Sequence, residues 1–99
     1  MTGTRDPLAA PLRAQLSLRG GRDWHLYVCT DRWPVHTFGR VLPVPTRTER
    51  SAALAALGFE PLPGAEWSWS EDAEDWRDAG SPVLLIAALA VRPLTGGAA

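Results

Sequence analysis

Two tryptophans separated by one serine, Trp67 and Trp69, constrain the fold of this chain more than any other feature. Side chains alternate between the two faces of a β-strand, so both indoles point to the same side of an extended segment. The neighbouring positions Glu66, Ser68 and Ser70 are polar. The pattern predicts a half-buried strand with one aromatic face, and we expect at least one of the two indoles to lie in the hydrophobic core.

A β-hairpin is predicted near the N-terminus. Residues 13–19 alternate between polar and apolar, which is typical of a half-buried strand. Gly20-Gly21 is a strong turn signal because both residues can adopt positive φ. A second strand should then run from about Arg22 to Thr30. The positions of the two strands that we expect to face the core are Ala14, Leu16, Leu18, Trp24, Leu26 and Val28.

One helix is predicted in the middle of the chain. Thr46 and Glu49 have the spacing of a capping box, in which each side chain bonds the backbone N–H of the other residue. The helix should run from about Arg47 to Leu57 and stop at Gly58, which can adopt the left-handed conformation. Its apolar stripe consists of Ala53, Leu54 and Leu57.

The remaining segments are predicted from prolines and apolar runs. Residues 31–45 are proline-rich and should form a loop with a short extended piece around 37–42. Residues 60–64 should form a turn, and 71–81 an acidic loop. The strand from Val83 to about Arg92 is apolar on both faces for most of its length, which indicates a central position in the sheet.

The order strand, strand, helix, strand, strand predicts an α+β fold. We expect a four-stranded, mainly antiparallel sheet with one helix packed on one face. A single domain should span residues 13–94, between a flexible N-terminal tail (1–12) and a flexible C-terminal tail (95–99). The helix covers one face only, so loops or another subunit must cover the second face, which carries Tyr27 and Cys29.

Composition excludes several classes of protein. The longest apolar run, Val83 to Val91, is far shorter than the ~20 residues that span a bilayer. No secretory signal pattern opens the chain, and its single cysteine cannot form an internal disulfide. We therefore expect a cytoplasmic protein without membrane contact and without a cofactor.

The charges are divided unevenly along the chain. Residues 1–58 carry eight arginines and four carboxylates, a net charge of +4, whereas residues 59–99 carry two arginines and seven carboxylates, a net charge of −5. This division is compatible with head-to-tail self-association or with two different partners. Chance and a solvated acidic loop give the same division, and we favour the loop as its explanation.

The segment from Arg32 to Phe38 combines a guanidinium, an indole and an imidazole within seven residues. It can clamp a planar or anionic ligand by stacking and charge. Alternatively, its aromatic rings fasten the loop to the sheet while the histidine bonds a backbone carbonyl. The candidate ligand- or partner-binding residues are Arg32, Trp33, His36, Phe38, Tyr27 and Trp76.

No catalytic or metal motif stands out. His25 and Cys29 are four residues apart on a predicted strand, roughly 13 Å, which is too far for both to ligate one zinc ion. Cys29 paired with a histidine is formally a nucleophile with its base, but a lone strand cysteine is more typical of a small buried apolar residue. The acidic residues after Ser70 lack the spacing of a calcium loop. We therefore predict neither catalytic nor metal-binding residues.

Four segments together resemble one family: Arg32 to Phe38, the capped helix through Pro61, Gly64 to Asp72, and Ser81 to Leu94. The chain is similar to a family of small uncharacterised proteins from Streptomyces and related actinomycetes, over about residues 13–94. The resemblance carries no functional residue to this chain, although it agrees with the arginine-only, alanine-rich composition.

Three hypotheses about function follow. The first is a non-enzymatic binding or regulatory module that forms a homodimer, because tryptophan and arginine dominate interface hot spots. The second is a nucleic-acid-binding accessory protein, because several arginines lie near Trp24 and Trp33 in the sequence. The third is a small ligand-binding or enzymatic domain that uses Trp33, His36 and an arginine.

Overall fold

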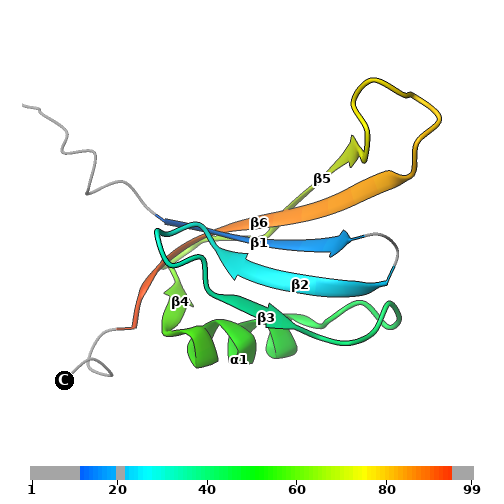
Figure 1. Cartoon of the computed structure of the whole chain (residues 1–99). Helices are drawn as coiled ribbons and strands as arrows, with labels where there is room; N and C mark the ends of the chain where they lie inside the picture. Colours follow the sequence, from blue (N-terminus) through cyan, green and yellow to red (C-terminus); the bar gives the residue numbers. More distant parts are fainter. Residues whose placement is uncertain (1–11, 20–21, 95–99) are drawn as a thin grey trace, which may run out of the picture.

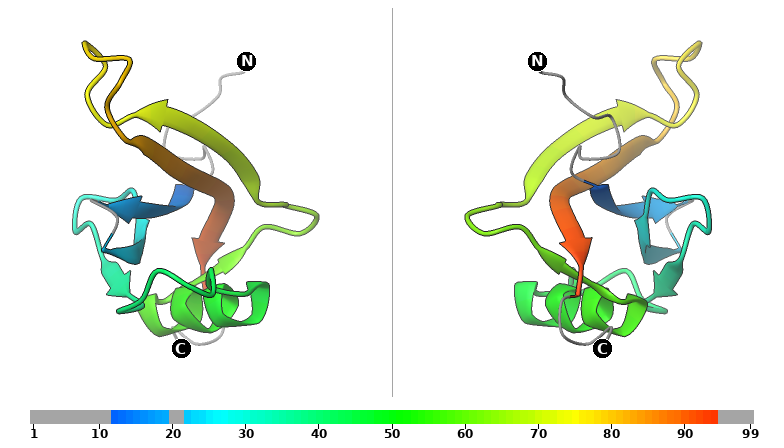
Figure 2. Two further views of the ribbon diagram at one scale, coloured as in Figure 1. Left: turned by 90° about the vertical axis from the view of Figure 1, so that its right-hand side faces the viewer. Right: turned by 90° about the vertical axis from the view of Figure 1, so that its left-hand side faces the viewer.

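The computed structural model describes residues 12–19 and 22–94, which form a curled antiparallel sheet with one helix across its open side (Figure 1). The elements are β1 (Leu12–Arg19), β2 (Asp23–Val28), β3 (Val35–Thr37), α1 (Arg47–Leu57), β4 (Phe59–Pro61), β5 (Ser68–Ala73) and β6 (Val83–Pro93). The end views show the strands curving into a half-barrel, with α1 along the bottom (Figure 2). The predicted four-stranded sheet with one helix packed on one face is therefore wrong, because the described residues form a sheet of six strands that curls around its core.

The predicted N-terminal hairpin strands are confirmed. β1 and β2 pair in antiparallel register with Leu16 opposite Leu26, so the expected apolar positions share one face. The Gly20-Gly21 turn lies outside the described residues, as do residues 1–11 and 95–99 of the expected flexible tails. Leu12, which we assigned to the N-terminal tail, belongs to β1.

β6 is the central strand, as its sequence predicts. One edge of β6 pairs with β1, and the other pairs first with β5 and then with β4. β4 and β5 lie along the same edge of β6 and are separated by the six residues 62–67. Over the same stretch β6 has only two residues, Leu89 and Ala90. These six residues leave the sheet as a protruding loop, which we call the 62–67 excursion.

β4 was predicted as part of a turn because of its proline. The amide of Leu62 donates to the carbonyl of Ala90, and the amide of Leu94 donates to the carbonyl of Gly58. These two bonds identify which residue pairs between β4 and β6 are hydrogen-bonded, because such pairs alternate with pairs that are not. Pro61 therefore lies in a non-hydrogen-bonded pair, where its missing N–H removes no bond from the ladder.

β3 was also missed, since the extended piece was placed at 37–42. The strand is Val35–Thr37 instead, and it forms an outer edge of the sheet beside β2. Residues 38–46 form an irregular loop that packs on the end of the core. The indole N–H of Trp24 donates to the carbonyl of Val41 at 2.8 Å, which ties this loop to the core.

α1 closes the open side of the half-barrel against β2, β3 and β4. The capping box is confirmed: the amide of Glu49 donates to the Thr46 hydroxyl at 3.1 Å, and the amide of Thr46 donates to the Glu49 carboxylate at 2.9 Å. Gly58 ends the helix in the left-handed conformation with φ 94°. The buried core that α1 completes consists of Ala14, Leu16, Trp24, Leu26, Val28, Ala53, Leu54, Ala87, Leu89 and Val91.

Candidate functional site

β5 and the first half of β6 form a ribbon whose far end projects beyond the rest of the sheet (Figures 1 and 2). We call residues 68–73 and 83–88, with the turn 74–82 that joins them, the arm. β1 pairs with β6 only as far as Ile86, so among the described residues 83–85 pair with β5 alone. The distal arm is therefore a two-stranded ribbon, an arrangement that gains little stability on its own.

The side of the arm that continues the core is exposed and largely apolar. Trp69 lies opposite the buried Ala87, so both side chains share the core face of the sheet. Beyond them the same face is open: Val83 is 58% exposed, Trp69 47% and Leu85 39%. We call this surface the arm face, and its residues are Trp69, Glu71, Ala73, Val83 and Leu85.

A buried arginine lies at the base of the arm face. The guanidinium of Arg50 is 5.0 Å from the ring centre of Trp67 and 5.8 Å from that of Trp69. Its Nε donates to the carbonyl of Pro45 at 3.0 Å, while its Nη1 is buried without a partner among the described residues. Burial, together with the charge of Arg47, lowers the pKa of Arg50. Aromatic faces rather than a carboxylate therefore stabilise this buried cation.

Arg50 is not among the site residues predicted from the sequence, although its position carries a signal. Arg50 precedes Ala53 and Leu54 by three and four residues, so it lies on the apolar stripe of α1. A long arginine on an apolar stripe indicates that its head group reaches something beyond the stripe. Here it reaches the two tryptophans.

The expected core position of the tryptophan pair needs correction. Trp67 precedes β5 and is partly buried against the core, whereas Trp69 is about half exposed. Trp24 is the buried indole, with 2% of its surface exposed. Trp67 and Trp69 still lie near each other, because both rings lie beside the same guanidinium.

The site residues predicted from the sequence do not form one cluster. Trp33 stacks on Tyr27 with ring centres 5.0 Å apart and covers part of the outer sheet face. His36 lies opposite Leu26 in the register, so it faces the helix side, where its ring meets Phe38 edge-on at 4.8 Å. Trp76 lies in the arm turn and is 83% exposed. The exposed Arg32 lies in the turn between β2 and β3.

His36 and Phe38 line a shallow groove of about 260 Å³ against α1. Glu49, which also lines it, accepts a hydrogen bond from Arg40 Nη2 at 2.6 Å. This pair and the Thr46 amide lower the pKa of Glu49 from 4.5 to about 2. The carboxylate is therefore occupied by the helix cap, which does not favour a role as a general base.

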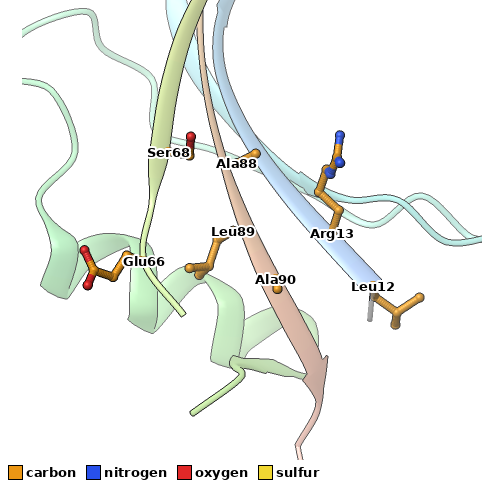
Figure 3. Close-up of a pocket in the computed structure, with 7 residues that line it drawn as sticks. All are labelled: Leu12, Arg13, Glu66, Ser68, Ala88, Leu89 and Ala90. Atoms are coloured by element: carbon orange, nitrogen blue, oxygen red, sulfur yellow. The ribbon is translucent and has the colours of Figure 1, made fainter. Parts of the chain in front are cut away.

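A larger groove of about 410 Å³ opens where the 62–67 excursion leaves β6 (Figure 3). Figure 3 shows Arg13 on one side and Glu66 on the other, with the small side chains of Ala88 and Ala90 between them. The first residue of β1, Leu12, also lines this groove. Its neighbours 1–11 lie outside the described residues, so the groove supports no assignment of a ligand.

The other reactive groups offer no catalytic arrangement. Burial raises the pKa of the Cys29 thiol, and the nearby Arg13 only partly opposes this shift. Within residues 12–19 and 22–94, no group of three His, Cys, Asp or Glu side chains is placed to hold a metal ion. In the same part of the chain no helix has the length and apolarity needed to cross a membrane.

Comparison with known proteins gives a family but no function. Residues 10–99 match the model described as "Family of unknown function (DUF6303)". Neither the curated proteins nor the solved structures contain a match to the chain.

Proposed function

The chain belongs to this family of unknown function, DUF6303, and we propose its function from the geometry because the family description names no activity. The protein is a small non-enzymatic binding or regulatory module that acts through protein–protein contacts at the arm face.

The exposed apolar surface of the arm carries this proposal. Trp69, Val83 and Leu85 lie side by side on one sheet face, and each leaves between 39% and 58% of its surface in water. Single exposed apolar residues are common on proteins, but a contiguous group is typical of an interaction site. A large aromatic ring at the centre of such a group is the usual anchor of an interface.

The base of the arm supports the same proposal. Arg50 is 8% exposed and has a buried nitrogen without a partner among the described residues. A buried donor without a partner costs in general about 1–3 kcal/mol, and here the contacts of the guanidinium with Trp67 and Trp69 offset part of that cost. A surface that retains a destabilising polar group beside an exposed indole is typical of a site selected for binding rather than for stability.

Self-association is part of the proposal. The uneven charge along the chain supports a homodimer, as the sequence leads us to expect. Light scattering at micromolar concentration should then give about twice the chain mass of 10.7 kDa. A monomer mass over the whole concentration range would remove self-association but not the binding of another protein.

The two alternative functions receive less support. The arm is rich in carboxylates, which repel nucleic-acid phosphates. Trp33 and His36 lie on opposite faces of the sheet, so a single ligand clamp cannot use both. We further propose, from composition alone, that the family belongs to Streptomyces and related actinomycetes and that this chain acts in the cytoplasm.

The experiment compares two exposed tryptophans. Wild-type protein, Trp69→Ser and Trp76→Ser are immobilised and incubated with extract of the source organism, and captured proteins are quantified by mass spectrometry. Both indoles are exposed, so Trp76→Ser controls for general stickiness. We expect proteins that wild type and Trp76→Ser retain and that Trp69→Ser loses on the order of tenfold or more. Equal capture by all three proteins would remove the arm face as the binding surface.

A further inference from the structure

β5 presents an open backbone edge. In an antiparallel ladder, residues alternate between directing their N–H and C=O groups toward the partner strand and away from it. The amide of Glu74 donates to the carbonyl of Pro82 at 2.9 Å, which identifies that pair as a hydrogen-bonded one. Counting back along the register in steps of two gives the residues whose backbone faces β6: Asp72, Ser70 and Ser68. The residues between them, whose backbone faces away from β6, are Ala73, Glu71 and Trp69.

One of these outward amides confirms the direction. The N–H of Ala73 donates to the carboxylate of Asp72 at 2.8 Å, as expected for an amide that does not bond β6. Among the described residues β5 pairs with β6 alone. The backbone groups of Trp69 and Glu71 therefore form an edge to which another strand can pair.

The edge couples backbone direction to side-chain chemistry. The residues with outward backbone groups carry the side chains of the arm face, including Trp69. An added antiparallel strand would pair with these residues of β5. The partner residue opposite each of them would direct its N–H toward β5 and its side chain over the arm face. On this face the partner side chains would lie directly beside Trp69, Glu71 and Ala73 of β5. Apolar side chains there would cover Trp69 and extend the apolar surface that Val83 and Leu85 form on β6, with Glu71 as the one charged residue of the arm face.

The other face of the same edge is acidic. Asp72 and Glu74 are exposed, are two residues apart, and form no ion pair among the described residues. The arm's arginine, Arg77, lies 3.4 Å from Asp75 instead. The alternate residues of an added strand would lie beside Asp72 and Glu74, where arginine or lysine is favoured and an acidic residue is disfavoured.

A second copy of the arm does not fit this edge. If two β5 strands paired antiparallel with Glu71 opposite Glu71, like charges would be directly opposed, which destabilises such a pair. With Trp69 opposite Glu71 instead, the two Glu71 carboxylates would still be diagonal neighbours on one face. The other edge strands, β3 and β4, have only three residues each. A segment of another protein is therefore the occupant that the charges favour.

We propose that the arm binds an extended basic segment of another protein, which adds to the β5 edge as an antiparallel strand with its apolar side chains on the arm face and its cationic side chains beside Asp72 and Glu74. This inference rests on the proposed function and specifies the partner. Backbone pairing provides affinity, while the two side-chain faces provide selectivity.

The test uses synthetic peptides of roughly eight residues, about the length of the β5 edge with its flanks. The reference peptide alternates valine and arginine, and a second alternates valine and glutamate. Two further versions of the valine–arginine peptide carry N-methyl groups, one on every valine and the other on every arginine. Fluorescence anisotropy of the labelled peptides measures the dissociation constant with the full-length protein.

The proposal predicts a specific order of affinities. The valine–arginine peptide binds, and methylation of its arginines changes little because their amides face away from β5. Methylation of its valines weakens binding on the order of tenfold or more, because the amides that pair with β5 are lost. The valine–glutamate peptide does not bind, and salt weakens the valine–arginine complex.

Charge reversal on the protein gives a matched control. The variant Asp72→Arg/Glu74→Arg should prefer the valine–glutamate peptide, while Glu66→Arg/Asp78→Arg, with the same change in net charge, should retain the wild-type preference. A shift in the control equal to that in the first variant would overturn the proposal in favour of net charge alone.

Other results would overturn it in different ways. Equal weakening by the two methylation patterns excludes strand addition, and equal binding of basic and acidic peptides excludes a basic partner. If no peptide binds, the inference fails, whereas the capture experiment with Trp69→Ser decides the proposed function independently.

Discussion

The indole of Trp24 meets that of Trp69 edge-on, with ring centres 5.9 Å apart and ring planes at 88°. One ring belongs to the core and the other to the arm, since Trp24 is 2% exposed and Trp69 47%. Edge-to-face geometry is favourable for aromatic pairs. This contact therefore joins the stable centre of the half-barrel to the projecting ribbon.

The two tryptophans should differ in their effect on stability. Trp24→Ala should lower the free energy of unfolding by about 3–5 kcal/mol, because it leaves a large cavity in the core. Trp69→Ala should lower it by only about 1–2 kcal/mol, through the lost aromatic contact with Trp24 and the lost cation–π contact with Arg50. Urea unfolding followed by far-UV circular dichroism measures both changes. Equal losses for the two variants would contradict the burial assigned to these rings.

The start of α1 depends on the hydroxyl of Thr46. Thr46→Ala removes the acceptor of the Glu49 amide and should lower the free energy of unfolding by about 1 kcal/mol. Thr48→Ala, one residue inside the helix, is the control and should have little effect. A larger loss for the control would mean that the helix begins at a different residue.

The same cap should make stability depend on acid. Contacts with Arg40 and Thr46 lower the pKa of Glu49 from 4.5 to about 2 in the folded protein. A carboxyl whose folded pKa is lowered contributes its stability fully above the unfolded pKa and loses it as the pH falls to the folded pKa. Glu49 should therefore stabilise the fold above pH 4.5 and lose that contribution between 4.5 and about 2.

Glu49→Gln isolates this effect, because glutamine can keep the capping hydrogen bond but does not titrate. The urea midpoints of wild type and variant should differ at neutral pH and converge near pH 2. A constant difference over this range would show that Glu49 titrates normally.

Arg50 and Trp67 should be energetically coupled. The guanidinium lies 5.0 Å from the centre of the Trp67 ring and 5.8 Å from that of Trp69. A double-mutant cycle with Arg50→Met and Trp67→Leu should give a coupling of about 1–2 kcal/mol, as expected for a desolvated cation–π contact. The matched cycle with Trp69→Leu should give less, because that ring is farther away and more exposed. A coupling near zero in both cycles would contradict the stabilisation of Arg50 by the indoles.

Local signals in the sequence were sufficient for part of the fold. The capping box at Thr46, the alternation from Ala14 to Leu18 and the apolar run of β6 each depend on neighbouring residues, and each prediction is confirmed. β4 and β3 were missed because they are three residues each and acquire their strand conformation by pairing with β6 and β2. The sequence predicts a turn at Pro61. A proline is tolerated in β4 because it lies in a non-hydrogen-bonded pair, and this depends on the pairing with β6 rather than on the neighbouring residues in the sequence.

The site was less predictable than the fold. Trp67 and Trp69 were recognised as a pair, but their burial depends on how far α1 extends beneath the sheet. The helix lies against β2, β3 and β4, so it leaves the arm face uncovered. Trp33 and His36 are near in sequence, yet the alternation of β3 directs His36 to the face away from the Trp33–Tyr27 stack.

The central claim is that the arm face contacts a partner protein. The most direct measurement places a photo-crosslinking amino acid at Val83 on the arm or at Val35 on β3, two exposed strand valines at distant parts of the sheet. After irradiation in the source organism, the account predicts a discrete crosslinked protein from position 83 and none from position 35. The same product from both positions, or a product from position 35 alone, would contradict it.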